Sequence, residues 1–171
     1  MLGRPDKSEA AEYYFTYIDQ VEGDDPIAVM REQLEAWPTE LAAIGDERSL
    51  YRYAPDKWSM RQVVNHVSDT ERAFAFRVLW FGRGFDTPLP SYDQAVAAAG
   101  AEADRVAWPA HLDEFRQVRS ATLWLFANMP EAAWKRGGVA SGNYVSVRAL
   151  AFIIAGHVAH HARILREKYG V

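Results

Sequence analysis

VRALAFIIAGHVAHHARILREKY, residues 147–169, is an apolar segment that contains three histidines. His157, His160 and His161 account for three of the five histidines in the chain. Ser146 precedes the segment as a candidate N-cap. The apolar residues that share a helix face with His157 and His161 are Leu150, Ile153, Ile154, Ile164 and Leu165. The pattern predicts a helix whose histidines border a hydrophobic core, where they either bind a metal or are simply buried.

The spacing within this segment separates the three histidines. His157 and His161 are four residues apart, so they lie on the same face of a helix and can reach one ion. His160 points about 100° away from His161, which assigns it to packing or to the surroundings of the site. Val158 stands where a zinc protease of the HExxH type has glutamate, so protease chemistry is disfavoured. On spacing alone, a purely structural histidine pair remains the more common alternative.

A third metal ligand is available in an earlier helix. His66 lies in VVNHVSDTER, residues 63–72, close to the core face marked by Val63 and Val67. Helical bundles build metal sites from side chains on facing helices, and three imidazoles leave one position open for water or substrate. His111, near a predicted helix start, is expected at the surface. Gly156, just before the pair, is expected to allow a close approach by a neighbouring helix or ligand.

Helix signals divide the rest of the chain into a bundle. Four helices are predicted within residues 24–44, 57–82, 109–129 and 146–169. Asp25 with Pro26, and Ser59 with Gln62, are N-terminal capping patterns. Pro38 is expected to kink or interrupt the first of these helices. No alternating pattern indicates a sheet, so the fold class is predicted to be all-α, a four-helix bundle within a single domain, residues 1–171.

The connections between these helices carry fewer signals. Residues 1–24 are predicted to be an N-terminal extension with a short helix in SEAAEYYFTYI, residues 8–18, packed on the outside. A long connection links the second and third helices, residues 83–108, and is expected to contain a short helix near 92–99 and to cross over the bundle. KRGGVASGNYVS, residues 135–146, is predicted to be a loop or a tight, hairpin-like excursion.

Composition restricts the partners and the location of the protein. The chain has 171 residues, a formal net charge of −4 and no tract rich in lysine or arginine, which argues against nucleic acid as a partner. It contains no cysteine, which favours a cytoplasmic location and leaves only His, Asp and Glu as metal ligands. No signal peptide and no apolar run of membrane-spanning length is recognised.

The chain resembles the DinB/YfiT-like metalloenzyme superfamily, in particular its DinB_2 group. The resemblance rests on YRYAPDKWSMRQVVNHVSDTERAFAFR (51–77), PLPSYDQ (88–94) and SVRALAFIIAGHVAHHARIL (146–165), and extends from about residue 25 to 169. It implies a bundle of unusual connection order and a divalent metal, commonly nickel or zinc, bound by His66, His157 and His161. Relatives include thiol-dependent transferases and isomerases that use glutathione, mycothiol or bacillithiol.

The resemblance therefore implies a metal-dependent enzyme that acts on a small molecule, with a low-molecular-weight thiol as a candidate substrate. A metal centre of this kind can support transfer of a thiol, isomerisation or hydrolysis. The alternative is a non-catalytic binding or assembly module whose metal site is structural or vestigial. The apolar excess also permits a homodimer through one face of the bundle.

Several polar residues are candidates for supporting roles. Asp69 is the candidate catalytic residue, because it follows His66 by three positions and could orient an imidazole or act as a base; the alternative is a solvated helix carboxylate. Arg77 and Arg83 could bind a substrate carboxylate, although exposed arginines more often pair with Asp or Glu.

Two further expectations concern residues around these candidates. Glu71 is expected to pair with Arg148 or another cation. Tyr92 and Asp93 are expected at the mouth of a pocket.

Overall fold

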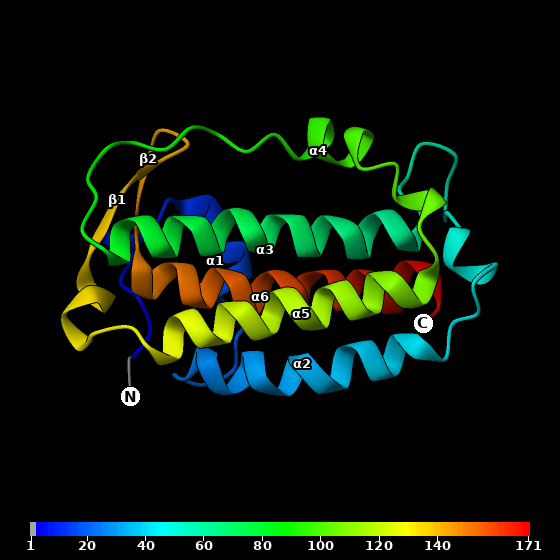
Figure 1. Cartoon of the computed structure of the whole chain (residues 1–171), viewed down its shortest axis with the longest axis horizontal. Helices are drawn as coiled ribbons and strands as arrows, with labels where there is room; N and C mark the ends of the chain where they lie inside the picture. Colours follow the sequence, from blue (N-terminus) through cyan, green and yellow to red (C-terminus); the bar gives the residue numbers. More distant parts are fainter. Residues whose placement is uncertain (1–2) are drawn as a thin grey trace.

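Four long helices form the body of the protein in a computed structural model that describes residues 3–171 (Figure 1). They are α2 (Pro26–Ala42), α3 (Met60–Gly82), α5 (Trp108–Ala127) and α6 (Val147–Ile164). A π-helical turn, Leu165–Tyr169, continues α6, and the N-terminal segment contributes the short helix α1 (Phe15–Ile18). The fold is mostly helical, and the predicted bundle is confirmed.

The four helices close into a ring in which consecutive helices are not always neighbours. Helix α3 packs on α5 and α6, and α2 also packs on α5 and α6, so α2 and α3 lie diagonally across the bundle. Figure 1 shows α3 and α5 running in the same direction and α2 and α6 running in the other. The connection from α3 to α5 therefore returns along the whole bundle, which agrees with the predicted crossover.

The capping residues begin the helices as the sequence indicates. The Asp25 carboxylate accepts hydrogen bonds from the backbone N–H groups of Ile27 and Ala28, both at 3.0 Å. At the start of α3, the Ser59 hydroxyl accepts from the Gln62 N–H at 3.1 Å, and the Gln62 side chain accepts from the Ser59 N–H at 3.1 Å. These reciprocal bonds satisfy donors that a helix start otherwise leaves unpaired.

The long connection and the segment before α6 pack together at one end of the bundle. Residues 135–146 form an antiparallel hairpin of β1 (Gly137–Ala140) and β2 (Asn143–Ser146). Because of this two-stranded hairpin, a strictly all-α class is not confirmed, although a loop or hairpin-like excursion was predicted here. The long connection docks on it, because the Leu89 N–H donates to the Val139 carbonyl at 2.9 Å. Helix α4 (Gln94–Gly100) lies further along that connection.

Helix α2 continues through Pro38, so the expected interruption is wrong. The helix runs without a break from Pro26 to Ala42, and Pro38 is buried within it. A proline removes one backbone hydrogen bond and crowds the preceding turn. Burial of Trp37, Pro38 and Leu41 against the other helices offsets that loss.

The N-terminal segment belongs to the core rather than to the outside. Ile18 and Val21 are buried in the cluster that contains the first half of α6. Helix α1 approaches α6 at Gly156, where an added Cβ would lie only 2.0 Å from the Tyr17 carbonyl oxygen. The close approach expected at Gly156 is confirmed, and its partner is a segment whose short turns have no helical periodicity in the sequence.

Replacing Gly156 by alanine is expected to destabilise the protein by about 3 kcal/mol. The new methyl group meets a backbone atom, so α1 must move, and the gain in helix propensity of about 1 kcal/mol is too small to compensate. Urea unfolding followed by circular dichroism measures the change. Gly100→Ala is the control, because nothing lies within 4 Å of its added Cβ. Equal stabilities of the two variants would refute the tight crossing.

A buried ion pair joins the helices near the centre of the bundle. Glu71 on α3 accepts from Arg119 on α5 through both carboxylate oxygens, at 2.8 and 3.1 Å from Nε. Arg119 also donates to Gln33 Oε1 at 2.7 Å, and the Gln33 amide donates to the Ala155 carbonyl at 2.9 Å. All four long helices are thereby linked.

The expected pairing of Glu71 with a cation is confirmed, and the cation is Arg119 rather than Arg148. Arg148 pairs with Glu9 of the N-terminal segment instead. In residues 3–171, no helix combines the length and the apolar character needed to cross a membrane.

Candidate metal centre

Three imidazoles from two helices converge on one point in the bundle. His66 lies on α3, and His157 and His161 lie one turn apart on α6. The Nε2 atom of His157 is 3.2 Å from the Nε2 of His66 and 3.2 Å from the Nε2 of His161. The three ligand atoms lie within 4.8 Å of one another. The structure therefore brings together the three histidines that the sequence singled out.

This arrangement fits the requirements of a divalent ion. In a tetrahedral zinc site with bonds of 2.0–2.1 Å, two ligand nitrogens lie about 3.3–3.4 Å apart. The two distances of 3.2 Å at His157 are close to that value. All three ligand atoms are nitrogens, and imidazole suits zinc, nickel, iron and copper alike. The donor set therefore fits a transition metal better than calcium or magnesium, which prefer oxygen.

Neighbouring groups hold the imidazoles in position. The Thr70 hydroxyl lies 3.2 Å from His66 Nδ1, one turn further along α3. When Nδ1 carries the ring proton and donates it to the Thr70 hydroxyl, the lone pair on Nε2 is free for a metal. This arrangement is common around metal-binding histidines. The Trp58 ring lies 5.0 Å from the His66 ring, and the Tyr17 ring 5.2 Å from the His157 ring. Thr70 and Trp58 thus restrain the orientation of the His66 ring, and Tyr17 restrains that of the His157 ring.

Burial keeps the cluster neutral. It lowers the pKa of His66 to about 4, with a smaller contribution from His160. Burial also holds the pKa of His157 and of His161 well below the usual value, and repulsion among the imidazoles adds to the effect. A metal ligand must be unprotonated, so at neutral pH these nitrogens are ready to bind an ion without releasing protons.

Acid is expected to destabilise the metal-free protein between about pH 6.5 and pH 4. In this window the unfolded chain protonates His66 while the folded protein does not, so stability falls as the pH falls. The pKa difference of His66 alone corresponds to roughly 3 kcal/mol. Thermal melts of protein treated with a chelator at pH 7.5 and pH 4.5 measure the loss. His66→Gln should melt with a weaker pH dependence, and an unchanged dependence would contradict the assignment.

The other two histidines lie outside the cluster. The His160 Nδ1 atom is 3.2 Å from the Gln20 amide nitrogen, and its ring packs edge-on against Tyr17. His111 was expected at the surface, but it is only 1 % exposed, so that expectation is wrong. Its Nε2 lies 2.9 Å from the Ala103 carbonyl oxygen, because the turn before α5 folds back over the helix start.

Asp69 lies on α3 and is half-buried. Its carboxylate accepts from Arg72 at 2.9 Å, and Arg72 also donates to Glu114 on α5. An ion pair of this kind is a common arrangement for a helix carboxylate. A role for Asp69 as a base or as an orienting group stays a prediction.

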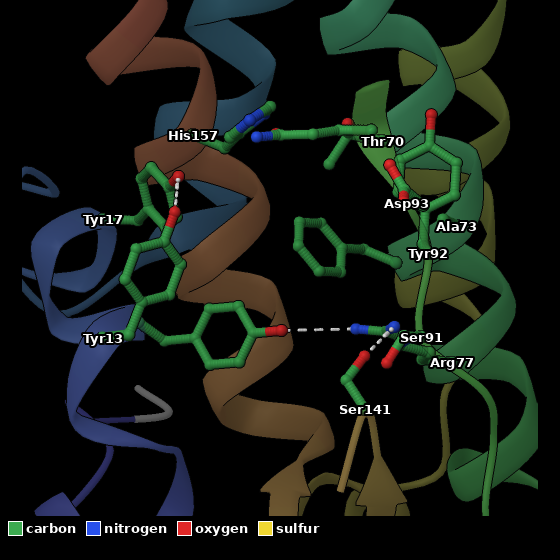
Figure 2. Close-up of a pocket in the computed structure, with 13 residues that line it drawn as sticks. Tyr13, Tyr17, Thr70, Ala73, Arg77, Ser91, Tyr92, Asp93, Ser141 and His157 are labelled. Atoms are coloured by element: carbon green, nitrogen blue, oxygen red, sulfur yellow. Dashed lines mark hydrogen bonds between the residues drawn. The ribbon is translucent and has the colours of Figure 1, made fainter. Parts of the chain in front are cut away.

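A cavity of about 420 Å³ reaches the cluster at His157 (Figure 2). It is enclosed by α3, the N-terminal segment, the long connection and the tip of the hairpin. The lining residues are Tyr13, Tyr14, Tyr17, Thr70, Ala73, Phe74, Arg77, Ser91, Tyr92, Asp93, Gln94, Ser141 and His157. Tyr92 and Asp93 were predicted to reach a pocket, and they line this cavity.

A second cavity, of about 290 Å³, reaches the cluster at His161. Trp58 and Val63 line it together with aromatic residues from the loop before α3 and from the C-terminal turn, Tyr53 and Tyr169. The cluster therefore borders two cavities, the first at His157 and the second at His161.

Sequence reasoning did not identify the three N-terminal tyrosines of the first cavity, Tyr13, Tyr14 and Tyr17. Tyr13 and Tyr17 share a hydrogen bond between their hydroxyl groups at 2.7 Å. Burial is the main cause of a raised Tyr17 pKa, so this hydroxyl stays protonated at neutral pH. The one signal in the sequence was the cluster of aromatic residues in EYYFTY, residues 12–17. Nothing in that pattern specifies which helix the aromatic residues face.

Together, the bundle and its histidines define a helical protein with a three-histidine site that can hold a metal ion. The chain belongs to the DinB superfamily, because the DinB_2 model of that superfamily matches residues 28–165. Among solved structures, the chain is similar to one described as "YfiT from Bacillus subtilis is a probable metal-dependent hydrolase with an unusual four-helix bundle topology". The two are 19 % identical, with a TM-score of 0.66, over 95 % of this chain and 91 % of that one. No curated protein matches the chain.

Proposed function

We propose that this protein is a metal-dependent enzyme that holds a divalent ion through His66, His157 and His161 and acts on a small molecule. The observation that supports the proposal is the convergence of three neutral imidazole nitrogens at the walls of two cavities. Nickel and zinc are the proposed metals. The cytoplasmic location and the homodimer stay predictions.

The accessibility of the cluster favours an enzyme over a binding or assembly module. A purely structural metal site is closed by four protein ligands, whereas a catalytic site keeps an open position. Here three protein ligands are present, and His157 and His161 each border a cavity. A divalent ion bound by three neutral ligands would retain its full charge and supply a Lewis acid, able to lower the pKa of a water or thiol or to polarise a carbonyl.

The finer proposal is transfer of a low-molecular-weight thiol, or a related isomerisation or detoxification reaction. Such a transfer brings two substrates together, and two cavities meet at the cluster. The residues of the first cavity would orient the acceptor substrate on aromatic faces, mainly those of Tyr14, Tyr17 and Phe74. Hydrolysis is the second candidate, and the description of YfiT favours it.

A paired assay distinguishes the two reactions. Protein loaded with zinc or nickel is mixed with glutathione and 1-chloro-2,4-dinitrobenzene, and separately with p-nitrophenyl acetate in the absence of thiol. Transfer predicts turnover that needs the thiol and disappears with a chelator and in His157→Ala. Ester cleavage without thiol, equally sensitive to the chelator, would favour hydrolysis instead. If neither activity depends on metal, these two reactions are excluded for those substrates.

A further inference from the structure

Three arginines are buried in the part of the chain that the structure describes, and one of them lacks a carboxylate partner. Arg61 forms an ion pair with Asp46 at 2.7 Å, and Arg119 forms one with Glu71 at 2.8 Å. Arg77 on α3 is 5 % exposed and makes no ion pair with any residue between 3 and 171. Arg77 therefore differs from Arg61 and Arg119 in having no carboxylate partner among residues 3–171.

All the hydrogen-bond partners of Arg77 are neutral. Its Nη2 atom donates to the Ser141 hydroxyl at 2.9 Å and to the Pro90 carbonyl at 3.5 Å, and its Nη1 atom donates to the Tyr14 hydroxyl at 3.4 Å. The guanidinium also lies 5.5 Å from the centre of the Phe74 ring. A guanidinium has five N–H groups. Two or more of them therefore have no acceptor among the described residues.

A buried cation without a counter-charge costs free energy, because it loses its water shell and gains no ion pair in return. Neutral hydroxyl and carbonyl partners recover only part of that loss, and two of the three bonds here are long. An anion bound from solution would complete the site. The planar fork of N–H groups matches a carboxylate in particular.

Arg77 faces the cavity that reaches the metal centre. Figure 2 shows Arg77 and Ser141 at one end of the group of lining side chains and His157 at the other. The space between them is lined largely by aromatic rings. Asp93 is the one carboxylate among the lining residues, and its Oδ1 atom already accepts two backbone N–H groups at the start of α4.

We propose that Arg77 binds the carboxylate of a small ligand with an aromatic or other apolar body, whose opposite end faces His157. Arg77 is the only arginine or lysine among the described lining residues, so a monoanion matches its charge better than a phosphate dianion. The role of the His157 end rests on the proposed function. The contact at Arg77 does not, because it needs no metal. If both proposals hold, the natural small-molecule substrate carries a carboxylate.

The test measures binding to metal-free protein by calorimetry, at constant ionic strength. The probes are acetate, phenylacetate and 3-phenylpropionate, with phenylacetamide as the uncharged counterpart and inorganic phosphate as the competing anion. Phenylacetate or 3-phenylpropionate should bind at least about tenfold more tightly than phenylacetamide. Arg77→Gln should weaken the binding of these acids by at least about tenfold. Arg77→Lys should retain part of it. Arg83→Gln is the matched control, because Arg83 is exposed at the end of the same helix and, unlike Arg77, does not line the cavity.

The outcomes separate this proposal from the metal proposal. Zinc content of Arg77→Gln should equal that of the wild-type protein, because Arg77 is not part of the histidine cluster. The carboxylate site is wrong if Arg77→Gln binds the acids as well as wild type, if phosphate binds more tightly than all three acids, or if wild type binds none of them. Should Arg77→Gln fail to fold, the comparison of phenylacetate with phenylacetamide on wild type still decides the matter.

Discussion

His157→Ala is expected to lose bound metal when the protein is purified without a polyhistidine tag. His157 is the central ligand, because its Nε2 atom lies 3.2 Å from both other ligand nitrogens. Loss of a residue that only supports a ligand typically lowers metal affinity by about 10–100-fold. Loss of the ligand itself should exceed that range, and elemental analysis of dialysed protein measures it.

His160→Ala is the matched control for this experiment. His160 is on the same turn of α6 and its ring packs against Tyr17 and His161, but its Nδ1 atom faces Gln20 and it is not one of the three clustered histidines. The control should retain its metal, and both variants should fold, as circular dichroism can verify. Unchanged metal content in His157→Ala would refute the proposed centre, and so would equal losses in the two variants.

Glu71→Leu is expected to lower the free energy of unfolding by about 3–5 kcal/mol. The substitution leaves Arg119, which is fully buried, with no carboxylate and only the Gln33 amide and the Met30 carbonyl as acceptors. Urea unfolding measures the loss. Glu71→Gln should lose less, because its amide oxygen still accepts a hydrogen bond.

A double variant tests whether the cost arises from the stranded charge. Glu71→Leu combined with Arg119→Met removes both charges and fills the space with apolar atoms, so most of the lost stability should return. The exposed pair Arg163–Glu167 is the control, and Glu167→Ala should cost less than about 1 kcal/mol. A double variant as unstable as Glu71→Leu would show that shape, rather than charge, accounts for the loss.

Local rules predicted the four long helices of the fold and placed two of the three histidines of the candidate centre on one helix face. The capping pattern at Ser59 and Gln62 specifies the start of α3 through bonds between near neighbours. Likewise, the spacing of His157 and His161 places both imidazoles on one face of a helix. Both inferences depend only on the geometry of a single helix.

Contacts between distant segments could not be derived in this way. The general build of helical bundles made His66 a candidate third ligand, but no rule for a single helix specifies that α3 packs beside α6, and only the resemblance to the superfamily implied the complete set of three histidines. The partner of Glu71 was left open between Arg148 and another cation, because several arginines were available and only the packing of α3 on α5 selects Arg119. His111 was misplaced because the turn just before α5, which has no helix pattern in the sequence, folds back over the start of that helix.

The contact at Gly156 has a consequence for how the specificity of related proteins can diverge. Residues 3–24 lie outside the segment matched by the superfamily model, yet their tyrosines form one wall of the cavity next to the metal ligands. The histidines and this wall come from separate stretches of the gene, joined at one glycine where two backbones touch. If the proposed function holds, substitutions among the tyrosines of residues 3–24 would alter which small molecules fit the cavity without touching the three histidines, and removal of this segment would take away that wall together with the buried Ile18 and Val21.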